Sequence, residues 1–352
     1  MASPGSEEIT ASVVIGVFNR AGPIVACVRS LVASTSSGFE IILVEDGSTD
    51  DSALVLDRLA SENPDRIVVV RNRTNRGASG ARNVGMERAR GEFVLFTDSD
   101  CVVEPTWIEE MVAAFRRSGA AGVSGTVLDK QPSNRAERAY VGSCLVIHKA
   151  PNLMESNMGL RRDLGLRFDE AIFGGEGDDL AIRMRAAGQT VTLAPAAIVH
   201  HHHALTFRSY MRMARQQGHG HTLLWYKHGR LLGRDIAAGG LAVLASPLLL
   251  AGAPAACVPI TLALLQLGAI LFNEAHYKGK SLGEALAVAP EAVAYYAVRI
   301  AAFFGTRAGI WLGREPAIVA SRRAWRTSFE SARGQAPEST PREHVDGTQT
   351  GD

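Results

Sequence analysis

The sequence predicts an α/β fold: a Rossmann-like open, mostly parallel sheet, followed by a helical region that associates with a membrane. Short apolar runs typical of buried strands recur every ~26 residues in the first hundred positions, which is the step of a βαβ unit. Segments with helical character separate these runs. Residues 236–272 contain no charged residue. The first two observations predict the sheet, and the third predicts the membrane-associated region.

Four strands and three helices are predicted before residue 100. Because ligands bind in such sheets where parallel strands deliver their carboxyl ends, the polar residues that follow the strands should converge on one crevice. These residues are Asn19, Asp46, Arg71 and Asp98. The strands are expected at residues 13–17, 41–44, 67–70 and 93–96, and the helices from 23, from 48 and at 78–90.

The next hundred residues mix the two patterns. They complete a domain that we expect to span residues 11–205, after a flexible N-terminus at residues 1–10. Helices are predicted at residues 105–117 and 178–187, and strands at 122–127, 144–147 and 197–199.

The composition narrows the class of protein. The 352 residues include 37 Lys and Arg against 36 Asp and Glu, so the chain has almost no net charge that would attract nucleic acid. The four cysteines form no CxxC pair, which fits a reducing compartment better than a disulfide framework or a zinc knuckle. The acidic N-terminus lacks the pattern of a signal peptide. We therefore expect membrane attachment to come from the C-terminal part.

The uncharged stretch at residues 236–272 is too long for one membrane-crossing helix. A single helix of this length would measure ~55 Å, against a hydrocarbon core of ~30 Å. Gly-Ala-Pro at residues 252–254 breaks it, so we expect a hairpin of two short helices that spans or re-enters the membrane. Trp225, Tyr226 and Tyr277 flank the stretch as interfacial aromatics do. A buried hairpin in a soluble domain is the alternative.

Amphipathic helices are expected on both sides of this hairpin, linking ones at residues 206–235 and interfacial ones at 284–330. Residues 292–312 are apolar but carry Arg299 and Arg307, which favours a helix lying in the interface over one that crosses it. The arginine-rich tail belongs on the cytoplasmic side, which places the sheet domain at the cytoplasmic face of the inner membrane. Residues 331–352 are predicted to be disordered.

Two carboxylates, Asp98 and Asp100, directly follow the fourth predicted strand with one residue between them. At the carboxyl end of a strand such a pair can bind one hard divalent cation, Mn²⁺ or Mg²⁺, with coordination positions left open for substrate phosphates. Negative charge on a leaving diphosphate is neutralised in such a site. A solvated turn is the alternative for an isolated Asp-x-Asp, and the position after the strand favours the metal site.

Several motifs occur in an order that is similar to a known family. Val-Glu-Asp-Gly-Ser-Thr-Asp at residues 44–50 resembles the Asp-Asp-Gly-Ser-x-Asp turn of glycosyltransferase family 2. The other similar segments are residues 13–20, 75–77, 81–85, 91–93, 98–100, 156–162 and 167–170. The resemblance covers residues 11–205. It implies the GT-A fold and a metal-dependent, inverting transfer of one sugar from a nucleotide-sugar, by family habit a UDP-sugar.

The resemblance also implies roles for the matching positions. Asp46 would accept hydrogen bonds from the base or ribose of the donor, and Arg82 would reach the diphosphate. An exposed surface arginine is the alternative for Arg82. Asp98 and Asp100 would hold the ribose edge, the metal and the diphosphate between them. The implied nucleotide-sugar site consists of Val17, Asn19, Asp46, Arg76, Arg82, Asp98 and Ser99.

The acceptor motif departs from the family pattern. Gly-Gly-Glu-Gly-Asp-Asp-Leu at residues 174–180 resembles the family's Gly-Gly-Glu-Asp-x-Asp-Leu, whose first Asp is commonly taken as the base, yet Gly177 stands there. Inverting transfer needs a base for the acceptor hydroxyl. Glu176 and Asp178 remain as candidates, and Asp178 is preferred because Gly177 would permit a one-residue change in the turn. Asp179 is expected to cap or salt-bridge the following helix.

Four histidines at residues 200–203 follow the predicted strand at 197–199. In related enzymes a histidine near this position completes the metal shell or contacts the diphosphate, and imidazole is a fair ligand for manganese. Neighbouring residues of a strand point to opposite faces, so at most two of the four can face the site. His200 directly ends the apolar run and is predicted as a ligand beside Asp98 and Asp100. An exposed polar run is the alternative.

The acceptor is expected to be a lipid-linked molecule or a saccharide, as in cell-envelope polysaccharide synthesis. The Gln-x-x-Arg-Trp motif of processive relatives is absent, which favours one sugar per encounter. A polyprenyl-phosphate sugar synthase is one alternative, because a phosphate nucleophile needs little deprotonation and would tolerate Gly177. A non-catalytic nucleotide-sugar-binding protein is the alternative from another class.

Overall fold

The computed structural model describes residues 9–141, 153–229 and 280–322 except 315 and 317, together with 264, 267–272 and 274. Four of the predictions fall wholly or mostly outside these residues: the flexible N-terminus at 1–10, the strand at 144–147, the hairpin at 236–272 and the tail at 331–352.

The first hundred residues fold as the strand spacing predicts. Four strands lie parallel in the order β3-β2-β1-β4, and each pair of successive strands is connected by a helix. The strands are β1 (Ala11–Val17), β2 (Phe39–Glu45), β3 (Ile67–Arg71) and β4 (Phe93–Thr97), and the helices are α1 (Pro23–Val32), α2 (Ser52–Glu62) and α3 (Gly77–Arg88). β1, β2 and β4 are buried almost throughout, which explains why they read as continuous apolar runs.

The sheet continues through four strands of mixed direction. β7 (Asn157–Arg161) pairs antiparallel with β4 and with β6 (Gly122–Asp129). β8 (Val191–His201) lies parallel to β6, and the short β5 (Cys101–Val103) pairs antiparallel with β8. Among the described residues this makes one eight-stranded sheet of order β3-β2-β1-β4-β7-β6-β8-β5. The predicted mostly parallel α/β sheet is confirmed, with β7 and β5 as its antiparallel members.

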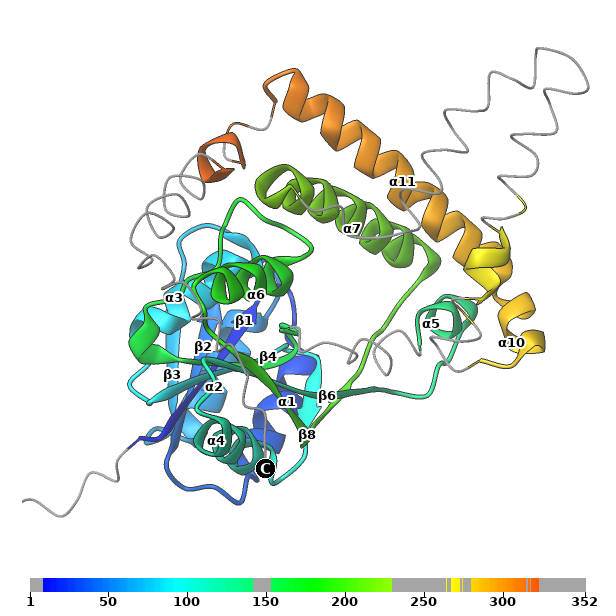
Figure 1. The fold of residues 1–352 in the computed structure, drawn as a ribbon. Helices are drawn as coiled ribbons and strands as arrows, with labels where there is room; N and C mark the ends of the chain where they lie inside the picture. Colours follow the sequence, from blue (N-terminus) through cyan, green and yellow to red (C-terminus); the bar gives the residue numbers. More distant parts are fainter. Residues whose placement is uncertain are drawn as a thin grey trace, which may run out of the picture.

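Helices cover both faces of this sheet (Figure 1). One core lies between the sheet and α1, α2 and α4 (Trp107–Ser118), and includes Ile15, Leu56 and Trp107. The other lies between the sheet and α3 and α6 (Glu176–Ala186), and includes Val14 and Leu180. Successive residues of β1 therefore enter different cores, as the alternation of a strand requires.

The C-terminal helices form a second packing unit beside the sheet domain. α7 (Phe207–His228) lies along α11 (Ala289–Trp311) (Figure 1), where Tyr210 stacks on Tyr295 with ring centroids 4.6 Å apart. A Cβ on Gly218 would lie 2.1 Å from the Arg299 carbonyl oxygen, so glycine is needed for this close approach. Among the described residues, no helix combines the length and the apolar character needed to cross a membrane. α5 (Arg135–Tyr140) and α10 (Leu282–Ala287) are two shorter helices of this region.

One buried amide, that of Asn157, joins the strands of the second half. β6 and β8 lose their regular register between Gly125 and Thr126, and the Asn157 Nδ2 group donates to the carbonyl oxygens of Thr126 at 2.8 Å and Ala197 at 2.9 Å. Its Oδ1 atom accepts from Trp107 Nε1 at 2.8 Å. A Cβ on Gly125 would lie 2.5 Å from this amide, so the irregularity and the glycine both make room for it.

We predict that Asn157→Leu lowers the free energy of unfolding by ~3 kcal/mol or more, because it leaves several buried polar groups without partners at ~1–3 kcal/mol each. Urea unfolding followed by circular dichroism measures this loss. The matched control is Ser124→Ala, which removes only longer hydrogen bonds of 3.3 and 3.4 Å in the same place. Equal losses for the two variants would contradict the assigned importance of the amide.

Candidate active site

The carboxyl ends of β1, β2 and β4 bring the predicted donor residues to one edge of the sheet. Asp46 follows β2 and is buried, and its backbone N–H donates to the Val17 carbonyl oxygen at 2.9 Å. Its Oδ1 atom accepts from Asn72 Nδ2 at 2.7 Å and from the Arg76 backbone N–H at 3.0 Å. Its Oδ2 atom makes no hydrogen bond with any described residue. Asp46 is therefore held in place by one oxygen, while the other remains able to accept a hydrogen bond from a ligand.

Asn19 connects the loop after β1 with the loop after β2. Its Oδ1 atom accepts from the backbone N–H groups of Thr49 at 2.8 Å and Asp50 at 3.3 Å. Its φ angle of 54° lies in the left-handed region, which asparagine tolerates better than most residues. The fourth residue expected at this edge, Arg71, does not join it, because its guanidinium pairs with Asp57 of α2.

Two arginines predicted for the donor site have different surroundings. The Arg76 guanidinium pairs with Glu170 at 2.8 Å, and only its backbone N–H contacts Asp46. Arg82 is buried, and its Nη2 atom lies 3.1 Å from Asp98 Oδ1. Arg82 is therefore not an exposed surface arginine. Ser99, the residue after Asp98, is also buried.

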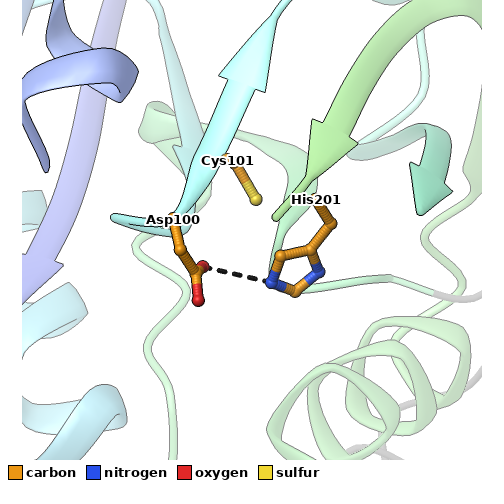
Figure 2. A group of neighbouring side chains, drawn as sticks. All are labelled: Asp100, Cys101 and His201. Atoms are coloured by element: carbon orange, nitrogen blue, oxygen red, sulfur yellow. Dashed lines mark hydrogen bonds and ion pairs between the residues drawn. The ribbon is translucent and has the colours of Figure 1, made fainter. Parts of the chain in front are cut away.

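Asp100 faces a histidine of β8, and that histidine is His201, whereas His200 was predicted. Figure 2 shows the two side chains, with Asp100 Oδ1 and His201 Nε2 3.1 Å apart. The β5–β8 register places His201 opposite Cys101 and His200 opposite Val102. Because alternate residues point to opposite faces of a strand, His200 turns away and its Nε2 atom lies 2.7 Å from Glu104 Oε1. The choice of His200 was based on the end of the apolar run, but β8 extends past that run and places His201, not His200, beside Asp100.

The residues around Asp100 fit a hard divalent cation. Asp100, Cys101 and His201 each offer one ligand atom, and these atoms lie within 4.8 Å of one another. A carboxylate oxygen and an imidazole nitrogen are suitable ligands for Mn²⁺, whereas a thiol is a soft ligand and Cys101 is fully buried. The fit to a cation thus depends on Asp100 and His201. Asp98, two residues before Asp100, forms an ion pair with Arg82.

Asp129 and His203 lie close to His201, and neither was predicted as a site residue. The His201 and His203 rings have centroids 3.5 Å apart, and His203 Nε2 lies 3.4 Å from Asp129 Oδ1. The hydrogen bond and charge of Asp100 and the charges of Asp98 and Asp129 outweigh burial, so the pKa of His201 is raised. β8 ends at His201, so the sequence signal for His203 was only its place in the run of four histidines at residues 200–203.

The start of α6 holds the two predicted bases. Glu176 is buried, and its Oε2 atom accepts from the backbone N–H groups of Gly174 at 3.1 Å and Gly175 at 2.8 Å. Burial raises the pKa of Asp178, opposed by the charge of Arg185 and reinforced by the charges of Glu176 and Asp179. A third carboxylate near this turn, Glu155, was not predicted, because it lies outside the motif at residues 174–180.

Asp179 forms the predicted salt bridge, and it also joins α6 to α7. Its carboxylate lies 2.8 Å from Arg183 Nε on the same helix, and 2.8 Å from both Lys227 Nζ and His228 Nε2 on α7. Burial opposes ionisation, but the His228 hydrogen bond and the charges of Arg183 and Lys227 lower the pKa of Asp179 well below its usual value. This buried network of ion pairs gives Asp179 a structural role, in which it connects α6 with α7.

Comparisons with known proteins agree with these motifs. Residues 12–171 match the model of Glycosyl transferase family 2. An uncharacterized glycosyltransferase of Nostoc sp. is 38% identical over 112 residues, which cover 32% of this chain and 34% of that protein. Glycosyltransferase GlyG of Streptococcus pneumoniae is 32% identical over 130 residues, which cover 37% of this chain and 43% of that protein.

A third relative is named for its substrates. The UDP-Glc:alpha-D-GlcNAc-diphosphoundecaprenol beta-1,3-glucosyltransferase WfaP of Escherichia coli is 35% identical over 89 residues, which cover 25% of this chain and 34% of that protein. The chain therefore spans between 34% and 43% of the length of these three relatives.

A solved structure with the same fold is that of the mannosyltransferase PcManGT from Pyrobaculum calidifontis, in complex with GDP-Man and Mn²⁺. It superposes with a TM-score of 0.58 and 20% identity, over 84% of this chain and 88% of that chain. The sheet is thus the GT-A-like mixed sheet that the resemblance implied. The family match, the order of the motifs and the shared fold show that this chain carries a glycosyltransferase family 2 domain at residues 12–171.

Proposed function

We propose that this protein transfers a single sugar, with inversion and with a divalent cation, from a nucleotide-sugar donor to an acceptor hydroxyl. The observation that supports this most strongly is the position of Asp46, Asp98 and Asp100 at the carboxyl ends of β2 and β4, the parallel strands on either side of β1, within a family 2 domain. Asp46 would bind the base or ribose through Oδ2. Arg82, held by Asp98, would face the diphosphate.

Asp100 and His201 would hold Mn²⁺ or Mg²⁺, with Mn²⁺ favoured by the imidazole ligand. When bound, the cation would neutralise the charge that develops on the leaving nucleoside diphosphate. Asp100 would bind as an ionised carboxylate, because the hydrogen bond and charge of His201 and the charges of Arg20 and His203 outweigh burial and lower its pKa. His201 would bind the cation as the neutral imidazole, so the cation would take the place of the His201 proton beside Asp100. The mannosyltransferase with the related fold was solved with Mn²⁺ and GDP-Man, which supports the choice of ligands.

The proposed acceptor is a lipid-linked saccharide at the cytoplasmic face of the inner membrane. The glucosyltransferase WfaP, a relative over part of the chain, is named for an acceptor on diphosphoundecaprenol. The surface of α10 and α11 supports membrane contact, because large apolar side chains are exposed there: Leu282 at 66%, Leu286 at 53% and Trp311 at 86%. α11 lies along α7, which directly follows β8 of the sheet domain, and α10 precedes α11 (Figure 1).

His201→Ala should weaken Mn²⁺ binding by at least ~10-fold, the loss found even for groups that only orient a metal ligand. Titration calorimetry with Mn²⁺ in the presence of UDP or GDP measures this directly. Asp100→Ala should abolish transfer, and a chelator should abolish it reversibly. The matched control is His200→Ala, which should retain Mn²⁺ affinity because His200 faces Glu104. Full turnover in the chelator, or an equal loss in the His200 variant, would refute this metal site.

Leu282→Ser should weaken binding to vesicles of phosphatidylethanolamine and phosphatidylglycerol by ~10-fold, because burying a leucine side chain stabilises by ~1.5–3 kcal/mol. Co-sedimentation of the full chain with these vesicles measures the affinity. Leu54→Ser is the matched control, since Leu54 of α2 is 70% exposed and belongs to the sheet domain. Equal vesicle binding by both variants would count against α10 and α11 as the membrane surface.

A further inference from the structure

Position 177 has no room for the carboxylate that the family pattern places there. A Cβ built on Gly177 would lie 2.1 Å from the Leu153 carbonyl oxygen and 3.0 Å from its carbon. Both are backbone atoms of the turn that precedes β7, so neither can move aside as a flexible side chain could. Glycine at 177 is therefore required by the packing of this turn against α6.

The side chain of Glu155 takes the place left by the missing carboxylate. Its Oε1 atom lies 3.1 Å from the position of that same Cβ and accepts a hydrogen bond from the Gly177 backbone N–H at 2.5 Å. A carboxylate thus stands beside position 177, but it is supplied by the turn before β7 and not by α6. Glu155 as a residue is half-buried.

The charged groups around Glu155 connect it with the donor side of the site. Glu176 from α6 and Arg82 from α3 act on it, together with the Gly177 N–H at the start of α6. Burial and the charge of Glu176 raise the pKa of Glu155 to about 7, against the opposing effects of Arg82 and the Gly177 N–H. The charges of Asp98, Glu155 and Glu176 in turn raise the pKa of Arg82 despite its burial.

The two bases predicted from the sequence are less suited to the reaction. Glu176 already uses Oε2 to accept two backbone hydrogen bonds from the turn at Gly174 and Gly175. Asp178 follows it by two residues, which is ~200° around a helix, so the side chains leave α6 in nearly opposite directions. The charge of Glu176 acts on Arg82, whereas the opposite charge that acts on Asp178 is that of Arg185.

We propose that Glu155 is the general base of the transfer, in place of the aspartate that position 177 lacks. This inference rests on the proposed transfer to a hydroxyl group. The acceptor hydroxyl gives its proton to the Glu155 carboxylate, and its oxygen forms the new bond to the anomeric carbon. The bond between that carbon and the phosphate oxygen of the donor breaks, and its electron pair leaves with the nucleoside diphosphate.

Glu155→Gln tests the base while retaining the carbonyl that accepts from the Gly177 N–H. We expect kcat to fall by ~10²–10⁴, with unchanged affinity for the nucleotide-sugar in the presence of Mn²⁺. Wild-type kcat should fall as the pH drops below about 7, because protonated Glu155 cannot accept a proton. The glutamine variant should lose this acid limb. The full chain in detergent is used throughout.

Glu155→Ala separates this role from a structural one. It also removes the hydrogen bond to Gly177, so it should lower the melting temperature more than Glu155→Gln does. Its loss in kcat should nevertheless be about the same as that of Glu155→Gln. A loss of kcat that follows the melting temperature, with Glu155→Gln as active as wild type, would overturn the proposal. So would a wild-type profile without an acid limb near pH 7, or loss of that limb in Asp178→Asn.

The failure of this proposal is distinct from failure of the proposed function. A wild-type chain that binds no nucleotide-sugar with Mn²⁺ and transfers no sugar would overturn both. Wild-type transfer to a hydroxyl acceptor, with full kcat retained by Glu155→Gln, would overturn only the role of Glu155. Transfer to bare polyprenyl phosphate alone would also overturn it, because a phosphate nucleophile needs no base.

Discussion

The Asn157 amide makes one continuous sheet possible where the strand directions and registers change. β7 runs antiparallel between β4 and β6, and β6 and β8 lose register next to it. Backbone carbonyls at such an irregularity would be costly to bury without partners, and the two hydrogen bonds from Asn157 Nδ2 provide them. The Trp107 indole fixes the amide from α4. The second half of the sheet therefore depends on one side chain for its local geometry.

The position of β7 has direct consequences for the acceptor side. The turn that leads into β7 lies against the start of α6, so close that Gly177 cannot carry a side chain. The same turn carries Glu155, which contacts the Gly177 N–H. The absence of a carboxylate at position 177 of α6 and the presence of the Glu155 carboxylate beside that position thus both result from the packing of this turn against α6.

Electrostatics connects the two sides of the site through a buried cation. Arg82 lies 3.1 Å from Asp98 and is also influenced by Glu155 and Glu176. A buried guanidinium needs such partners, because desolvation disfavours its charge. One arginine on α3 therefore interacts with Asp98 after β4 and with Glu155 and Glu176 near the start of α6, and its position connects the proposed metal site with the proposed base.

The sequence by itself determined the βαβ half of the fold, because strands buried on both faces leave continuous apolar runs at regular spacing. It also determined the edge where Asp46, Asp98 and Asp100 meet, because parallel strands deliver their carboxyl ends to one place. Only the tertiary structure placed His201 beside Asp100 and His200 beside Glu104, since both positions depend on where β8 ends and on its register with β5. It alone placed Glu155 beside Gly177, because local patterns cannot report a contact between residues 22 positions apart.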